Sequence, residues 1–226
     1  MPASPRSTPR SPCKSATSRA KARAAAPALS RRERGTLAAD RMVIAALEVM
    51  AEQGYEAATL AAIGQAAGYS RGLATHHFGT KAELFAMVLR SVTRDFLVEV
   101  ARASSGKAGL DALAAFVTAH RRLAEGTPAR VRALFVLSFQ SLVVNSPMKD
   151  AAIHELLTYR DWARRTIEQG IAAGTIRADV DAQAEAVQFC GTLFGLTLQW
   201  LIDPVGSPLA PAHRRFVARL RRDLSA

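Results

Sequence analysis

The sequence predicts an all-α protein of about nine helices, and three observations lead to this fold class. Apolar residues after residue 35 recur at intervals of three and four, and no segment shows the sustained alternation of a β-strand. Hydroxyl or acidic residues stand where helices would begin, and Gly or Pro where they would end. With 226 residues and 49% hydrophobic content, the chain can also bury a sizeable core.

Residues 1–34 differ from the rest in composition. They hold nine Arg or Lys and one acid, so eight of the eleven excess positive charges lie there, with five of the ten prolines. Because such a segment has almost nothing to bury, we expect a disordered basic tail. Its Arg- and Ser-rich character is also typical of an organellar transit peptide, so that alternative stays open at this point.

Four helices are expected in the first half of the ordered chain. The first carries an apolar stripe through Val43 and Leu47 and should end at Gly54. Three further helices each follow a hydroxyl residue that can cap them. They begin after Thr59, Ser70 and Thr80 and are expected to span residues 60–66, 71–77 and 81–103.

Five helices are expected in the second half. They are predicted over residues 110–125, 130–144, 147–173, 181–202 and 211–224, with Asp179 or Asp181 opening the fourth. The segment 130–144 is apolar almost all round, which predicts burial on several sides. The longest apolar run, 187–202, has 16 residues, fewer than the roughly 20 that span a bilayer, so we expect a buried helix and no membrane partner.

The stretch GYSRGLATHHFGTKAELF (68–85) raises the question of what His76 and His77 do. Adjacent helical residues point about 100° apart, so the two rings cannot hold one metal ion from a single face. Two short helices joined at Gly68 instead have the spacing of a helix-turn-helix, with Gly68 at positive φ. This spacing places Ile63 and Ala74 in the small shared core and leaves polar side chains on the outward face of the second helix.

The string from Thr59 to Leu84 resembles the signature of the TetR family of bacterial transcriptional repressors. Ten positions carry the resemblance: Thr59, Ile63, Ala67, Gly68, Ser70, Gly72, His77, Phe78, Lys81 and Leu84. It implies a helix-turn-helix DNA-binding domain at 35–82 and a ligand-binding and dimerisation domain at 83–226. The DNA contacts that it implies come from Thr59, Ser70, Arg71, Leu73, Ala74, Thr75, His76 and Lys81.

Other roles implied by the resemblance are structural, and two positions depart from the family pattern. His77 and Phe78 would pack between the first, third and fourth helices. The family usually has tyrosine at the position of Thr75, so a phosphate contact there is weakened or moved. It usually has alanine at the position of Gly64, so the second helix could be looser here.

The second domain is predicted to hold a lipophilic or aromatic small molecule, if a cavity exists among its apolar helices. A plain packed core is the alternative. The candidate ligand residues are His120, Phe135, Phe139, Gln140, Leu142, Tyr159, Trp162, Gln188, Phe189 and Thr192.

A homodimer is predicted because Gly191 and Gly195 lie one turn apart and would allow a second helix to approach closely. In the TetR family the eighth and ninth helices pair with the same two in a partner. The candidate interface is Gly191, Phe194, Gly195, Leu198, Phe216, Leu220 and Leu224.

The function predicted from the sequence is a cytoplasmic, nucleoid-associated bacterial repressor that binds a palindromic operator as a homodimer and is released by a small effector. No catalytic residues, cofactor or metal are expected. One alternative is a basic architectural protein that coats DNA without an effector; another is a helical enzyme using His120, His154 and either Glu155 or Asp161. If the tail reaches DNA, Arg31, Arg32 and Arg34 are the expected minor-groove contacts.

Overall fold

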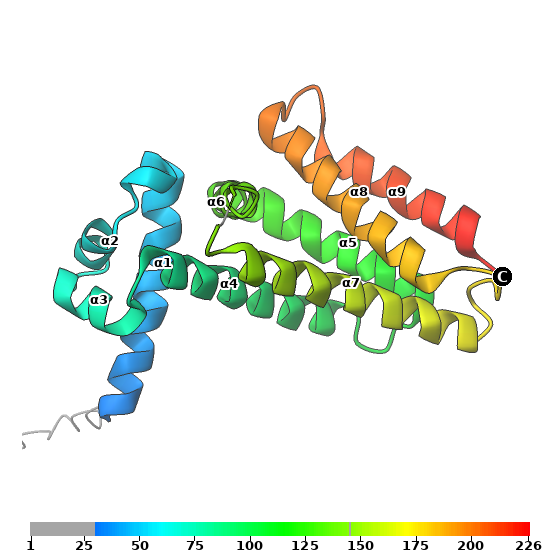
Figure 1. Cartoon of the computed structure of the whole chain (residues 1–226). Helices are drawn as coiled ribbons and strands as arrows, with labels where there is room; N and C mark the ends of the chain where they lie inside the picture. The colour runs from blue at the N-terminus through cyan, green and yellow to red at the C-terminus, as the bar shows by residue number, and fades with distance from the viewer. Residues whose placement is uncertain (1–29, 145) are drawn as a thin grey trace, which may run out of the picture.

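The computed structural model describes residues 30–144 and 146–226, and these form nine α-helices and no strand. The helices are α1 Arg31–Ala57, α2 Leu60–Ala66, α3 Arg71–Phe78, α4 Lys81–Ala103, α5 Gly109–Gly126, α6 Pro128–Gln140, α7 Lys149–Ala172, α8 Ala182–Ile202 and α9 Leu209–Leu224. Helices α1 to α3 lie at one end of the molecule and the C-terminus at the other (Figure 1). The predicted all-α class is confirmed.

Side chain to backbone hydrogen bonds fix the helix starts in the first half. Thr59, Ser70 and Thr80 accept bonds from the backbone N–H groups of Ala62, Leu73 and Glu83. The Glu83 carboxylate accepts from the Thr80 N–H at 2.8 Å, which completes the predicted capping box. All three predicted cap residues are therefore confirmed.

Helix α1 begins four residues earlier than the sequence analysis placed it. Ser30 and Glu33 form a capping box, and the helix runs from Arg31, so the backbone of Arg31, Arg32 and Arg34 is helical rather than part of a flexible arm. The expected flexibility of these three residues is therefore corrected, and their contact with a minor groove stays a prediction. The rest of the predicted tail lies outside the described residues. At the other end Gly54 has φ 84°, which interrupts α1 where its end was expected.

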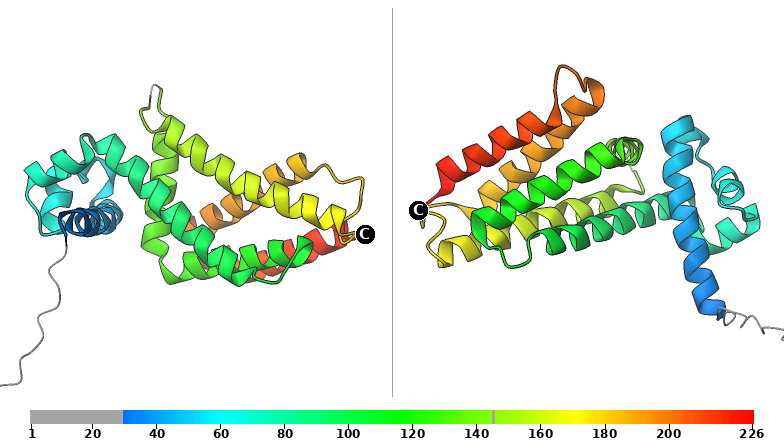
Figure 2. Two further views of the ribbon diagram at one scale, coloured as in Figure 1. Left: turned by 90° about the horizontal axis from the view of Figure 1, so that it is seen from below. Right: turned by 180° about the vertical axis from the view of Figure 1, so that it is seen from behind.

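Helix α4 connects two hydrophobic cores. Its first half supplies Leu84, Phe85 and Val88 to a core with α1, α2, α3 and α6, and its second half supplies Phe96 and Val100 to a core with α5, α7, α8 and α9. Figures 1 and 2 show α4 leading from α3 into the bundle. The domain boundary predicted between residues 82 and 83 assigns nearly all of α4 to the second domain. The first half of α4 nevertheless packs in the first core, with α1, α2, α3 and α6.

Helix α6 ends earlier than predicted. It lies across the bundle, seen end-on in Figure 1 and lengthwise in the left view of Figure 2, and stops at Gln140. The following residues form turns in which Leu142 and Val144 are 77% and 85% exposed. The predicted burial of residues 141–144 is therefore wrong, because an apolar run does not tell which surface covers it.

The packing of α2 against α3 depends on Gly64. A Cβ added there would lie 3.2 Å from the Ser70 carbonyl oxygen and 3.3 Å from the Ala74 Cβ, closer than ordinary contacts. The Tyr69 N–H donates to the Gly64 carbonyl at 2.7 Å, and Gly68 has the predicted positive φ, 78°. Gly64 therefore permits close packing, which corrects the expectation of a loose second helix.

Replacing Gly64 with Val should lower the free energy of unfolding by about 1–3 kcal/mol, because the larger side chain forces α2 and α3 apart. Thermal unfolding measures this loss. The control Ala66→Val introduces the same side chain at an exposed position of α2 and should change stability much less. Similar melting temperatures for the two variants would contradict the close packing.

Candidate functional site

The outward face of α3 is a compact polar surface. Arg71, Thr75 and His76 are exposed, and Ser70 at the start of the helix is exposed as well. Gly72 lies among them, and a Cβ added there would meet only the Ser70 hydroxyl oxygen, at 3.8 Å. Backbone and short polar side chains are thus accessible together, as contact with a nucleic-acid groove requires.

Two residues expected at this surface lie elsewhere. Ala74 has no exposed surface and packs in the first core, so its predicted DNA contact is wrong. The reason is the helical repeat: Ala74 lies four residues before the buried Phe78, and both therefore face inward. Leu73 is half-buried and packs against the same core. Thr59 is exposed and serves as the cap of α2.

Lys81 has internal partners in this structure. Its ammonium donates to the backbone carbonyls of Tyr55 and Glu56 and lies 3.9 Å from the centre of the Tyr55 ring. Partial burial lowers the pKa of Lys81, while the nearby Glu56 carboxylate opposes that shift. The side chain therefore joins the start of α4 to the end of α1, and its contact with a phosphate stays a prediction.

The adjacent histidines have different environments. His76 is exposed, whereas His77 is half-buried, and a Cβ added at Gly35 of α1 would lie 3.8 Å from the His77 Cε1 atom. The His77 and Phe78 ring centres are 6.0 Å apart. The geometry is consistent with His77 as a packing residue between α1 and α3. Within the described residues no group of three or more His, Cys, Asp or Glu side chains could hold a metal ion.

An aromatic cluster fills the middle of the second core. Phe116 is at its centre, with its ring 4.7 Å from Trp162, 5.1 Å from Phe96 and 5.4 Å from Phe189. The Tyr159 hydroxyl donates to the Thr93 hydroxyl at 2.9 Å, and burial raises the pKa of Tyr159 to about 12. The ring of His120 lies 6.0 Å from that of Phe96, so Tyr159, Trp162, Phe189 and His120 belong to one packed cluster, and their contact with a ligand stays a prediction.

The other predicted ligand residues are scattered. Phe135 belongs to a third cluster and stacks on Phe194 at 4.4 Å. Phe139 and Leu142 are 44% and 77% exposed. Gln188 is also exposed on α8, while Gln140 and Thr192 are half-buried. Exposure excludes these three residues from an interior pocket, because Phe139 and Gln188 face outward from their helices and Leu142 lies in the exposed turn after α6.

Three residues near the aromatic cluster were not predicted as site residues. Phe96 and Phe116 look like ordinary stripe residues of their helices, so periodicity gives no reason to single them out. His213 of α9 is 3% exposed, and its ring lies 5.5 Å from that of His120 of α5. Only the packing of α5 against α9 brings these histidines together.

The buried histidine pair lacks hydrogen-bond partners. Nδ1 of His120 and both ring nitrogens of His213 are buried without one. Burial, and then His213, lower the pKa of His120 to about 3; burial, and then Arg121, lower the pKa of His213 to about 4. Both rings are therefore neutral near pH 7, which is the form that an apolar interior favours.

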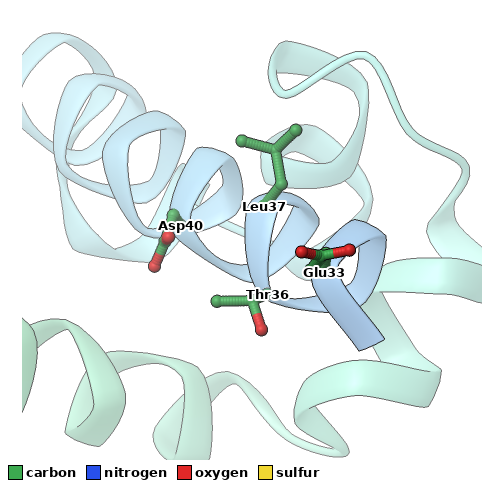
Figure 3. A pocket seen from close by; sticks show the side chains of 4 residues that line it. All are labelled: Glu33, Thr36, Leu37 and Asp40. Atoms are coloured by element: carbon green, nitrogen blue, oxygen red, sulfur yellow. The ribbon is translucent and has the colours of Figure 1, made fainter. Parts of the chain in front are cut away.

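Two of the grooves on the surface of the described residues involve α1. One, of about 320 Å³, is formed by α1 alone, and Figure 3 shows its four side chains, Glu33, Thr36, Leu37 and Asp40, projecting from that helix. The other, of about 680 Å³, lies between α1, α4 and α7. The second groove is lined both by α1, which belongs to the helix-turn-helix end, and by α7, which packs in the second core.

This arrangement defines a class of protein: a helix-turn-helix that presents an exposed polar helix, joined by a long shared helix to a second helical core. Residues 43–88 match the model of bacterial regulatory proteins of the tetR family. Over 108 residues the chain is 30% identical to the HTH-type transcriptional regulator BetI of Burkholderia thailandensis, and the alignment spans 47% of each protein.

Solved structures have the same fold. The complex of SmeT, a repressor from Stenotrophomonas maltophilia, with triclosan is 20% identical with a TM-score of 0.71, over 84% of this chain and 92% of that one. A transcriptional regulator of Saccharomonospora viridis in complex with choline is 18% identical with a TM-score of 0.73, over 84% and 99%. Residues 43–88 are thus similar to the TetR family of bacterial transcriptional regulators, and 84% of the chain shares its fold with these solved structures. No described helix is long and apolar enough to cross a membrane.

The histidine pair predicts that stability falls in mild acid. Because both folded pKa values lie below the usual 6.5, the unfolded chain takes up protons first, and stability is lost as pH falls from about 6.5 toward 4 and then 3. The slope is at most about 1.4 kcal/mol per pH unit for each proton. Urea unfolding at several pH values measures it. The variant His213→Leu should flatten this dependence, while the exposed control His154→Gln should keep it; equal slopes for both would contradict the assignment.

Proposed function

We propose that this chain is a ligand-responsive repressor that acts in the bacterial cytoplasm by binding a two-fold symmetric DNA operator as a homodimer. The observation that carries the proposal is the outward face of α3, where Arg71, Thr75 and His76 are exposed beside the accessible backbone of Gly72. Arg and His can donate hydrogen bonds to base edges or phosphates in the major groove, and Ser70 can bond a phosphate at the helix start.

A small molecule is the proposed effector, and the aromatic cluster of the second core is its proposed site. The cluster combines large apolar rings with the unpaired nitrogens of His120 and His213, so a lipophilic molecule with a polar group suits it. Two relatives of this fold have been solved with small molecules, triclosan in one and choline in the other, which supports such a role.

The proposed dimer contact is centred on the exposed side of α8. A Cβ added at Gly191 or Gly195 meets nothing within 4 Å, so a second helix can approach there. Phe194 and Ile202 of the same helix are 41% and 76% exposed, and Leu198 is half-buried. These apolar groups would be covered by the same surface of a second copy.

The contribution of α9 to this contact is corrected. Phe216, Leu220 and Leu224 are 5%, 4% and 5% exposed and pack in the second core of their own chain. The exposed face of α9 instead carries Arg214, Arg215, Arg219, Arg221 and Arg222. This face is charged, with Arg221 ion-paired to Asp111 and Arg222 to Asp223, so we restrict the apolar contact to α8 and its neighbours.

We expect Arg71→Ala to lower affinity for DNA fragments selected by the purified protein by about 1–3 kcal/mol if the guanidinium reads a base. Fluorescence anisotropy on selected and random DNA over a salt series measures both affinity and selectivity. The control Arg122→Ala removes the same charge from an exposed position of α5 and should leave selectivity unchanged. A wild-type protein with equal affinity for selected and random DNA would instead identify a DNA-coating protein.

We expect Gly195→Leu to dissociate the dimer while helical content persists, because the added side chain occupies the space through which the partner helix approaches. Sedimentation velocity at micromolar concentration gives the mass of the species. The control Thr118→Leu places the same side chain on the exposed side of α5 and should remain dimeric. If both variants have the mass of the wild-type dimer, the contact does not involve this part of α8.

A further inference from the structure

The groove between α1, α4 and α7 is built from both cores. Asp40 and Val43 of α1 form one wall, His154 and Glu155 of α7 form another, and α4 runs between them. The apolar lining includes Val43 of α1 and Leu97 and Val98 of α4. Its volume of about 680 Å³ is in the range that holds a small organic molecule.

Glu155 is an unusual residue in this wall. It is only 7% exposed, and its Oε1 atom is buried with no hydrogen-bond partner. A buried carboxylate oxygen without a donor loses hydration and gains nothing in exchange. The nearby hydroxyls do not donate to it, because Tyr159 donates to Thr93, and Thr158 donates to the carbonyl of His154.

The charges around the groove favour a cation. Asp40 contributes a second carboxylate from the opposite wall, and neither Asp40 nor Glu155 has an ion-pair partner among the described residues. Arg94 at the groove is already paired with Asp95 at 3.1 Å and bonded to Ser91 at 3.3 Å. Arg90 is exposed at the groove, and we treat it below as the internal competitor for Glu155.

We propose that this groove binds an organic ammonium ion, with the ammonium on Glu155 and an apolar body along Val43, Leu97 and Val98. Thr93 lines the groove, whereas its hydrogen-bond partner Tyr159 packs in the aromatic cluster, so we treat the groove as a second small-molecule site. A bound molecule would touch α1 and α7 at once and thereby fix the helix-turn-helix relative to the second core. Binding itself can be measured without DNA, so failure here leaves the proposed operator binding untouched.

The experiment uses three probes that share a phenyl ring on a four-carbon chain and differ in their polar end: 4-phenylbutylamine, 4-phenylbutanol and 4-phenylbutyrate. Each is titrated into the full chain near pH 7, and isothermal titration calorimetry gives its affinity. The protonated amine should bind at least about tenfold more tightly than the alcohol, a difference of about 1.4 kcal/mol, and the carboxylate should bind most weakly. Glu155→Gln keeps the shape of the side chain and should remove the advantage of the amine. Glu168→Gln, on the exposed side of the same helix, should keep it.

A second variant locates the apolar body. Val98→Trp leaves both carboxylates in place but fills the groove beside α4, so binding of both the amine and the alcohol should fall. Equal affinity of the amine for the wild type and for Glu155→Gln would overturn the proposal, as would equal affinities for the three probes. If the Arg90→Ala variant binds the amine and the wild type does not, the Arg90 side chain pairs with Glu155 in the wild type. The groove is then not a ligand site of the natural protein.

Discussion

The close contact between α2 and α3 at Gly64 is the constraint on which the proposed DNA-binding surface depends. With no side chain at that position, the Ser70 carbonyl and Ala74 can approach α2, and the turn closes at Gly68. Burial of Ala74 and Phe78 then fixes the rotation of α3 about its own axis. Because α3 has only eight residues, this rotation alone decides that Arg71, Thr75 and His76 point outward.

Two kinds of polar side chain hold the helices in place around that contact. Exposed caps such as Ser30, Thr59 and Ser70 satisfy the orphan N–H groups at helix starts. Lys81 instead satisfies a helix C-terminus. Its ammonium donates to backbone carbonyls at the end of α1 and thereby links α1 to α4. The second core differs, since it contains unpaired histidine nitrogens and an unpaired carboxylate oxygen among its helices. Its polar groups are therefore less completely satisfied than those around α3.

Local signals in the sequence predicted the fold well, whereas contacts between distant helices could not be predicted from it. Thr59, Ser70 and Thr80 were identifiable because a cap and its helix are neighbours in the chain. The stripe of Phe216, Leu220 and Leu224 was also identifiable, but periodicity does not tell whether the covering surface is the same chain or a second copy. Glu155 entered only the enzyme alternative and His213 no predicted site, because the burial of each depends on a helix far away in sequence. Arg71, Thr75 and His76 could be placed outward because the spacing of a short helix-turn-helix leaves them few alternatives.

Because α4 is one continuous helix that packs in both cores, a rotation of α4 in one core also moves its other end. A helix of 23 residues is about 34 Å long, so a rotation of roughly 10° about its middle moves each end by about 3 Å. In the proposed two-fold dimer the same rotation occurs twice, and the separation of the two α3 helices changes by about 6 Å. Successive major grooves on one side of DNA are about 34 Å apart, so this change would remove one recognition helix from its groove. A rotation of roughly 10° in α4 would thus be large enough to separate a bound from a released geometry of the proposed dimer.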